Sequence, residues 1–330
     1  MASASVSGKA ALVTGAGSGI NLAFTRLLLS RGCNVVLADL NLRPEAEELV
    51  QSYTSGSENP GVGRKAQAMF YRTDVSSWTD LSKVFSATKK PYGGVDIVCA
   101  GAGVFEPSWS SFWKPPGTGE SIVDSVAGGR FKSIDINLTH PIRLTQIAIM
   151  DHLRERKAKK TDATPTVRTK TIIHVSSVNG QATPLWSPLY NVSKHGINGF
   201  VRTLAPLEKN LGVRVAAIAP GLVKTPLWSE TEEKTGPLSK NVVWVTAEEV
   251  AEVMLSIVEK NAINSRFRDV NAPSDSVVVP IAGGSILEIS GDRVRAVEAF
   301  HDPGPQGISR EDFDVSQMEE GVFKDLDEHV

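Results

Sequence analysis

Residues 10–39 read AALVTGAGSGINLAFTRLLLSRGCNVVLAD, and this stretch decides the fold. The apolar residues 10–13 predict a strand, the glycine-rich residues 14–19 a tight turn, the periodic apolar residues 22–29 a helix, and residues 34–38 a second strand. A strand, a helix and a strand in this order form a βαβ unit. At such a turn, glycines let the backbone approach a pyrophosphate, which the N-terminus of the helix then binds.

The same alternation continues along the chain. Further strands are predicted at 66–71, 95–100, 171–175, 213–219 and 285–289, with helical patterns between them that are long enough for crossovers. Strands that alternate with helices indicate an α/β fold, here a Rossmann-type doubly wound parallel sheet. Because no internal repeat or low-complexity tract interrupts the pattern, we expect a single domain over residues 1–300.

Four segments lie outside this pattern. Residues 104–130 are a loop insertion rich in Gly, Pro, Ser and Trp, and residues 154–170 are predicted to be a basic, solvated loop. Residues 225–245 follow the sixth strand and are expected to form a mobile lid over the carboxyl edge of the sheet. Residues 301–330 hold nine Asp and Glu against two Lys and Arg, so we expect an acidic C-terminal extension or tail.

Composition excludes several classes of protein. The chain has 330 residues, of which 41% are hydrophobic and 22% charged, with only 2 Cys, which excludes collagen, a disulfide scaffold and wholesale disorder. No apolar run reaches the ~20 residues that a bilayer crossing needs, so no membrane span is expected, and the N-terminus lacks a secretory signal, which favours a cytoplasmic location. The basic loop lacks interleaved aromatics, so no nucleic acid partner is expected, and the six His lack ligand spacing, so no metal site is expected.

Asp39 ends the second strand, 20 residues after Gly19. At this distance a carboxylate can accept hydrogen bonds from both hydroxyls of an adenosine ribose. The same carboxylate would repel a 2′-phosphate, which favours NAD over NADP, and Arg43 is the one nearby cation that could favour NADP. A cap or turn role for Asp39 is the alternative.

Tyr190 and Lys194 are predicted to lie on one face of a helix. Ser187 and Pro188 are typical of an N-cap and a first-turn proline, so the helix should begin there and place the two side chains four residues apart. A phenol with a pKa of about 10 is a poor base at neutral pH, but a lysine ammonium and a nicotinamide cation both favour phenolate. Lowering the pKa by roughly 3 units needs about 4 kcal/mol, and Tyr190 then becomes a workable proton acceptor.

Together with further motifs, these features resemble the short-chain dehydrogenase/reductase family over nearly all of residues 8–290. The motifs are the 14–19 turn, Asp74-Val75, Ala102-Gly103, Asn137, Ser177 standing 13 residues before Tyr190, the Tyr190/Lys194 pair, and Pro220-Gly221 with Val223 and Thr225. Residues 38–42 and 190–200 are most similar to NAD-linked 15-hydroxyprostaglandin dehydrogenases and to fungal secondary-alcohol dehydrogenases of natural-product pathways.

The resemblance implies roles for individual residues. Tyr190 is expected to be the acid/base, Ser177 to orient the substrate oxygen, Lys194 to bind the nicotinamide ribose as well, and Asn137 to complete a water-linked proton relay. Asp74 is expected to read adenine, and Val223 and Thr225 to fix the carboxamide. The expected cofactor-binding residues are Gly15, Gly17, Ser18, Gly19, Ile20, Asp39, Leu40, Asp74, Val75, Ala102, Gly103, Tyr190, Lys194, Pro220, Val223 and Thr225.

The chain departs from the family pattern at two positions. Asn21 stands where the glycine motif usually ends in Gly, and its side chain must find room near the first turn of the helix. Gly101 replaces an Asn that normally braces the sheet, so another group must satisfy the partners of that Asn.

We therefore expect NAD-dependent oxidation of a secondary alcohol to a ketone on a hydrophobic substrate, in secondary metabolism. Val178, Trp186, Leu227 and Trp228 are expected to contact that substrate, although the tryptophans, with Trp109, Trp113 and Trp244, are equally suited to core or lid packing. The alternatives are an NAD(P)H-dependent carbonyl reductase and a catalytically silent dinucleotide-sensing or scaffold protein. Helices around 138–153 and 190–211 carry apolar residues on more than one face, which predicts a homodimer or homotetramer.

Overall fold

The predicted βαβ unit starts the structure: β1 (Ala10–Thr14) and β2 (Asn34–Asp39) lie parallel, and α1 (Gly19–Ser30) joins them. The computed structural model describes residues 5–54, 66–159, 169–229, 243–266, 277–299 and 315–329. All five residues of β1 are buried, as expected for a parallel strand that is covered on both faces.

Eight strands form one sheet in the order β10-β9-β6-β5-β4-β1-β2-β3. The strands beyond the first unit are β3 (Ala68–Arg72), β4 (Ile97–Ala100), β5 (Lys170–Val175), β6 (Val213–Pro220), β9 (Ile286–Ser290) and β10 (Arg293–Ala296). All neighbours are parallel except β9 and β10, which are antiparallel. Strand order switches sides between β1 and β4, and such a switch point opens a crevice at the carboxyl ends of the strands, where sheets of this kind bind ligands.

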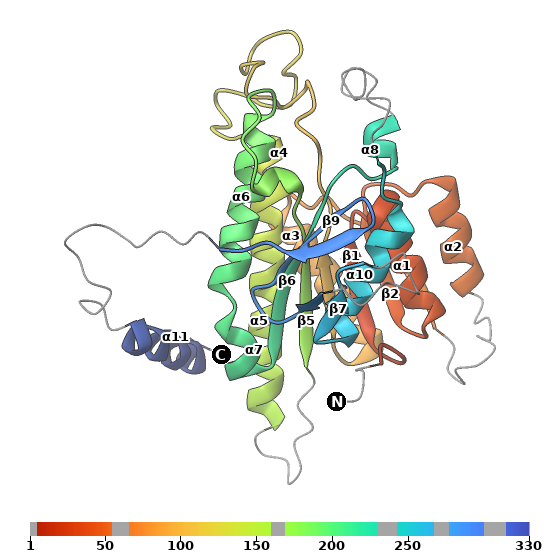
Figure 1. Ribbon diagram of the computed structural model, residues 1–330, viewed down its shortest axis with the longest axis vertical. Helices are drawn as coiled ribbons and strands as arrows, with labels where there is room; N and C mark the ends of the chain where they lie inside the picture. Colours follow the sequence, from red (N-terminus) through yellow and green to blue (C-terminus); the bar gives the residue numbers. More distant parts are fainter. Residues whose placement is uncertain are drawn as a thin grey trace.

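Helices cover both faces of this sheet (Figure 1). The helices on one face are α1, α2 (Pro44–Thr54) and α10 (Ala247–Glu259), which contribute to one buried apolar cluster. The helices on the other face are α3 (Trp78–Tyr92), α5 (His140–Lys159), α6 (Pro188–Thr203) and α7 (Pro206–Leu211), which contribute to a second. The predicted Rossmann-type doubly wound α/β fold is thereby confirmed.

All seven strands predicted from the sequence are present, with bounds shifted by at most two residues. The sequence pattern did not predict β10, which carries two arginines in four residues, or the small antiparallel pair β7 (Ala262–Asn264) and β8 (Val278–Pro280). These strands are short and lie at an edge or outside the main sheet, so they lack the long apolar runs of the central strands.

The predicted loop insertion 104–130 contains turns and one isolated bridge, between Ser111 and Lys114, but no helix. It leads into the short α4 (Lys132–Ile134) and a π-helical turn, η1 (Asp135–Thr139), at the start of α5. Two other short elements lie at the carboxyl edge: the 3₁₀ turn η2 (Val178–Gly180) and α8 (Pro226–Ser229). Of the predicted lid 225–245, residues 230–242 lie outside the described residues.

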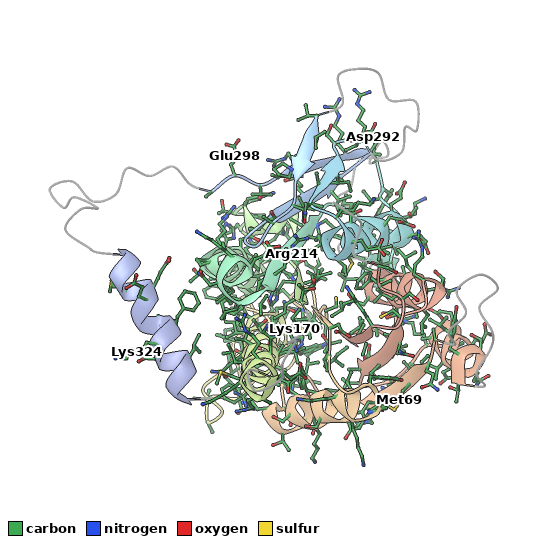
Figure 2. The ribbon with its side chains drawn as sticks, turned by 90° about the horizontal axis from the view of Figure 1, so that it is seen from below. Met69, Lys170, Arg214, Asp292, Glu298 and Lys324 are labelled. Carbon is green, nitrogen blue, oxygen red and sulfur yellow. The ribbon has the colours of Figure 1, made fainter. Side chains whose placement is uncertain are left out.

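The prediction of a basic loop over 154–170 is wrong at both ends. Residues 154–159 continue α5, because Glu155 pairs with Lys89 at 3.3 Å and Arg156 donates to the Leu211 carbonyl at 2.6 Å. Lys170 begins β5 with its side chain 2% exposed, and its Nζ lies 3.5 Å from Asp151 Oδ2 and 5.4 Å from the centre of the Phe85 ring. Figure 2 shows Lys170 inside the body of the molecule.

The acidic tail contains a helix, α11 (Val315–His329), that charge counting alone did not predict. Phe323 and Leu326 on this helix pack against the apolar cluster that α5 and α7 share, while Lys324 is exposed at the periphery (Figure 2). In Figure 1, α11 lies near α7 and far from α8. The described part of the tail, residues 315–329, therefore packs near α7 and not beside α8. Phe313, the other phenylalanine of the tail, lies outside the described residues.

Within the described ranges, no helix is both long and apolar enough to span a bilayer.

Candidate active site

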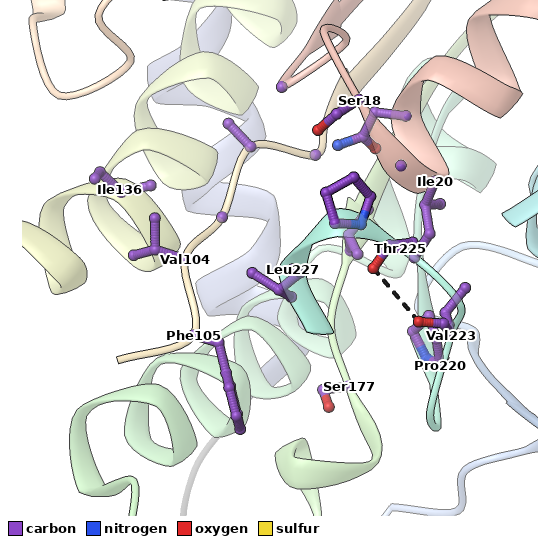
Figure 3. Close-up of a pocket in the computed structure, with 18 of the residues that line it drawn as sticks. Ser18, Ile20, Val104, Phe105, Ile136, Ser177, Pro220, Val223, Thr225 and Leu227 are labelled. Carbon is purple, nitrogen blue, oxygen red and sulfur yellow. Dashed lines mark hydrogen bonds between the residues drawn. The ribbon is translucent and has the colours of Figure 1, made fainter. Parts of the chain in front are cut away.

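A cavity of about 950 Å³ opens at the carboxyl edge of the sheet, where the switch point predicts it. Figure 3 shows Val104, Phe105 and Ile136 on one side of it, across from Val223 and Thr225. The cavity wall includes almost all of the residues predicted from the sequence: Gly15, Ser18, Gly19, Ile20, Asp39, Leu40, Asp74, Val75, Ala102, Gly103, Ser177, Val178, Trp186, Tyr190, Lys194, Pro220, Val223, Thr225, Leu227 and Trp228. Gly17 and Asn137 are not among the wall residues.

The glycine-rich turn fits a dinucleotide. Gly19 has a φ of +57°, a left-handed conformation that favours glycine, and a Cβ on Gly17 would lie 2.9 Å from Asp39 Oδ2. Ser18 is the N-cap residue of α1, yet its side chain makes no capping hydrogen bond, which leaves the N-terminal N–H groups of the helix to a ligand.

Asp39 lies at one end of the cavity with its carboxylate fixed by backbone donors. Gly17 N donates to Oδ2 at 2.8 Å, and Leu40 N donates to Oδ1 at 2.7 Å. The carboxylate thus makes the turn contacts of the alternative role while it also faces the cavity. Arg43 is on the same wall.

Asp74 lies on the wall nearby, with hydrogen bonds from the Ser76 N–H at 2.9 Å and from Lys132 Nζ at 3.2 Å. Partial burial acts to raise the pKa of Asp74, but the hydrogen bonds from Ser76 and the charge of Lys132 outweigh burial and lower the pKa. Asp74 is therefore ionised at neutral pH. The sequence did not point to Lys132, which stands 58 residues away in the chain.

Tyr190, Ser177 and Lys194 meet at the other end of the cavity. α6 carries Tyr190 and Lys194 on one face, as predicted, and Ser177 follows β5 at the carboxyl edge. Lys194 Nζ donates to the Val175 carbonyl at 2.7 Å and lies 5.3 Å from the centre of the Tyr190 ring. The three polar groups therefore converge where the cavity ends.

Burial raises the pKa of Tyr190 to about 12, although a hydrogen bond with the Ser177 side chain acts to lower it. Burial also lowers the pKa of Lys194 to about 8, which leaves the lysine mostly protonated at neutral pH. The predicted lowering of the Tyr190 pKa depends on a nicotinamide cation as well as on Lys194, so it stays a prediction; in the protein chain by itself, burial outweighs the hydrogen bond with Ser177.

Asn137 lies in the π-helical turn before α5 and is 1% exposed. Its side-chain amide accepts from Val104 N and donates to Val104 O, both at 2.8 Å. A Cβ on Gly103 would lie 3.3 Å from Asn137 Oδ1 and 3.8 Å from Lys194 Nζ, so a side chain at 103 would contact both polar groups.

Aromatic side chains line the cavity beside Tyr190. The Phe105 ring centre lies 4.6 Å from that of Tyr190, 5.2 Å from Trp186 and 5.0 Å from Trp228, and Trp228 also contacts Trp244 at 6.3 Å. Trp186 and Trp228 therefore each pack on Phe105 and also line the cavity, whereas Trp109 and Trp113 are not part of its wall. The sequence pattern did not single out Phe105, although its position two residues after Gly103, past the end of β4, was an available signal.

The two departures at 21 and 101 meet in space. A Cβ on Gly101 would lie 2.6 Å from Asn21 Cγ, so the Asn21 amide occupies the space that a side chain at 101 would need. The backbone at the end of β4 is bonded to Thr14 instead: Oγ1 accepts from Gly101 N at 3.0 Å and from Ala102 N at 3.3 Å. Thr14 thus satisfies the backbone N–H groups of residues 101 and 102, while the Asn21 amide fills the space beside Gly101.

Ser187 occupies the N-cap position of α6, as predicted, but its side chain does not cap the helix backbone. Its Oγ lies 3.3 Å from Asn191 Oδ1 instead. In the part of the chain that the structure describes, no three His, Cys, Asp or Glu side chains are grouped so that they could hold a metal ion.

Comparisons with known proteins agree with this geometry. A family model described as short chain dehydrogenase matches residues 9–236. The 15-hydroxyprostaglandin dehydrogenase (NAD(+)) of Rattus norvegicus is 29% identical over 283 residues, which cover 81% of this chain and 92% of the rat protein. The 2,5-dichloro-2,5-cyclohexadiene-1,4-diol dehydrogenase of Sphingobium indicum is 30% identical over 223 residues, 67% of this chain and 75% of that enzyme.

Among solved structures, a short chain dehydrogenase from Burkholderia cenocepacia J2315 in complex with NADP has a TM-score of 0.61 and 19% identity, and the match covers 87% of this chain and 98% of that one. At this identity the likeness concerns the fold.

Proposed function

The chain belongs to the short-chain dehydrogenase/reductase family, and from this premise we propose that it oxidises a secondary alcohol to a ketone on a hydrophobic substrate with NAD. That it is an oxidoreductase acting on CH–OH groups follows from the family and from its dehydrogenase relatives. The observation that carries the finer proposal is the convergence of Tyr190, Ser177 and Lys194 at the aromatic end of a cavity whose other end holds Asp39.

In this proposal Tyr190 is the general base. Its phenolate takes the proton of the substrate hydroxyl, while the Ser177 hydroxyl orients the substrate oxygen. The chemistry that a nicotinamide supplies when bound is acceptance of a hydride from the alcohol carbon. Lys194 keeps its ammonium near the Tyr190 ring, where it favours phenolate and can bind a ribose hydroxyl, and Asn137 holds the water that passes the proton onward.

We propose NAD as the cofactor, because the Asp39 carboxylate is fixed by two backbone donors at the ribose end of the cavity. A 2′-phosphate placed there would meet a like charge. The rat relative is named for NAD(+), which supports the choice. The turn residues Gly15, Gly17, Ser18, Gly19 and Ile20 would hold the pyrophosphate, Asp74 the adenine, and Val223 and Thr225 the carboxamide.

Carbonyl reduction is the second candidate, since burial holds Tyr190 protonated in the protein chain by itself, with a pKa of about 12. A protonated tyrosine is the form that donates a proton to a ketone oxygen. A catalytically silent sensor or scaffold has no chemical need for Ser177, Tyr190, Lys194 and Asn137 together, which disfavours that reading.

The cellular location, the oligomeric state, the metabolic role and the domain bounds are also proposals. The two cysteines of the described residues, Cys33 and Cys99, are buried and unpaired, which suits the reducing cytoplasm. Exposed apolar side chains on α5 and α6, Ile142 at 38% and Val192 at 55%, support a homodimer or homotetramer built on these helices. A role in secondary metabolism and a catalytic domain over 1–300 with an acidic extension over 301–330 complete the proposal.

The test is an assay of the purified protein with hydrophobic secondary alcohols and NAD or NADP, and with the matching ketones and NADH or NADPH, followed by the absorbance of the reduced nicotinamide. We expect alcohol oxidation with NAD, and NAD binding at least about tenfold tighter than NADP, or about 1.4 kcal/mol. Asp39→Ala should reduce that preference, with Glu45→Ala on α2 as the control. Absence of any turnover in either direction would contradict the proposal.

A further inference from the structure

Glu106 is a buried carboxylate with an unusual backbone conformation. It is 6% exposed, and its φ is +37°. Among the described residues, no other non-glycine residue has a positive φ. A positive φ is unfavourable for a side chain as large as glutamate. The surrounding contacts must therefore hold this residue in place.

The Glu106 carboxylate joins the insertion 104–130 to α6. Oε2 accepts a hydrogen bond from Tyr190 N at 3.0 Å, across 84 residues of sequence. Oε1 accepts from Phe112 N at 3.0 Å and from the Ser111 hydroxyl at 3.3 Å. One carboxylate thus connects the backbone of Tyr190 to two residues of the insertion.

The start of α6 needs such an acceptor. The first N–H groups of a helix have no partner within the helix, and an N-cap side chain usually accepts from one of them. Ser187 does not do so here. The Glu106 carboxylate takes that place from outside the helix, and its negative charge is favourable at a helix N-terminus.

Phe105 contacts the same tyrosine through its ring. The Phe105 and Tyr190 rings meet edge to face with centres 4.6 Å apart, at an interplanar angle of 89°. Adjacent residues of the loop after β4 therefore contact the side chain and the backbone of Tyr190.

We propose that Glu106 is a positioning residue for the proposed reaction: it caps α6 from the insertion and so fixes Tyr190 relative to Ser177 and Lys194. This proposal rests on the proposed function for its catalytic consequence. Its structural content, the bond between Glu106 and the Tyr190 N–H, can be tested without turnover.

The first measurement is amide hydrogen exchange of the segment 187–191, read by mass spectrometry on the full-length protein. In Glu106→Ala we expect at least about tenfold faster exchange at the Tyr190 amide, because its acceptor is gone. Glu106→Gln keeps one acceptor oxygen and the shape of the side chain. Its exchange rate at the Tyr190 amide should therefore lie between those of Glu106→Ala and the wild type. Unchanged exchange in Glu106→Ala would overturn the proposal.

The second measurement separates kcat from nucleotide binding. For Glu106→Ala we expect kcat per nucleotide-binding site to fall at least about tenfold, with the Kd for NADH within about twofold of the wild type, and for Glu106→Gln a smaller fall. A merely structural role would lower the number of binding sites and leave kcat per site unchanged, and that result would overturn the proposal. Two controls apply: Glu120→Gln removes an exposed charge of the insertion, and Ser111→Ala removes one bond to Glu106 but not the bond to Tyr190.

The two measurements distinguish failure of the proposed function from failure of the positioning role of Glu106. If the wild type turns over no alcohol or ketone, the proposed function fails, while the exchange of the Tyr190 amide still decides the role of Glu106 in holding α6.

Discussion

Asn21 and Gly101 share one space at the carboxyl end of β4. Because a Cβ at 101 would lie 2.6 Å from Asn21 Cγ, the two positions cannot both carry a large side chain. The sequence showed two separate departures from a family pattern, but it could not show that they compensate for one another, since they lie 80 residues apart in the chain.

This coupling predicts the behaviour of a swap. Gly101→Asn should overlap the Asn21 amide, and Asn21→Gly should leave a gap behind the glycine-rich turn, so each should lower the free energy of unfolding by about 1–3 kcal/mol. The double variant Asn21→Gly/Gly101→Asn should recover more than half of the summed loss, measured by urea unfolding and by NADH binding. Strictly additive losses would mean that the pair is not coupled.

His140 and His174 are buried groups that make stability depend on pH. Burial lowers the pKa of His140 to about 4 and that of His174 to about 3. The unfolded chain, with histidine pKa values near 6.5, binds protons that the folded chain does not. Stability is therefore full above about pH 6.5 and is lost as the pH falls from there toward 4 and then 3.

We expect each histidine to remove about 1.4 kcal/mol from the free energy of unfolding per pH unit within its window. Urea unfolding between pH 7 and pH 4 measures this slope. His174→Gln should lower the slope, because the buried ring that excludes a proton is gone. A pH-independent stability in the wild type would refute the account of the buried rings.

At the scale of elements, the strands that position the site could be predicted and the contacts between distant loops could not. The periodicity of apolar residues and the placement of glycines predicted β1, α1 and β2, and Ser187-Pro188 predicted the start of α6. Each of these signals depends on neighbours within a few residues. The continuation of α5 through Lys159 and the cap of α6 by Glu106 depend on partners 55 to 84 residues away. Local patterns carry no information about such partners.

α8 closes one side of the cavity with Leu227 and Trp228. Trp228→Ala should raise the KM for a hydrophobic alcohol about five- to tenfold with little change in kcat, because it removes ring contacts worth roughly 1 kcal/mol next to the substrate and none of the polar groups. Steady-state kinetics measure this effect. Trp113→Ala, which removes an exposed ring outside the cavity wall, is the matched control and should change neither constant.

At the scale of the whole molecule, residues 301–330 differ from the first 300 residues in the sign of their net charge. Residues 301–330 carry 2 basic and 9 acidic groups, or −7, so with a total of −2 the first 300 residues carry +5. Among the α11 side chains that the structure describes, Phe323 and Leu326 are partly buried and pack on the apolar cluster near α7.

A stop after Phe300 should therefore leave the KM and the NAD affinity within about twofold of the full chain and lower the free energy of unfolding by about 1–2 kcal/mol, since two partly buried apolar side chains are lost. Kinetics, thermal unfolding and light scattering on both chains measure these effects. A large rise in KM would place the tail at the substrate site after all, and a change in oligomeric mass would place it between subunits.

The central claim is that Tyr190 moves the proton while the rest of the cavity binds the nucleotide. Tyr190→Phe tests it most directly, with turnover followed by nicotinamide absorbance and NAD affinity by calorimetry on the same preparation. We predict that kcat falls by roughly 10²–10⁴ while the Kd for NAD stays within about twofold, because the substitution removes the hydroxyl and no major nucleotide contact. Turnover within tenfold of the wild type would contradict the account.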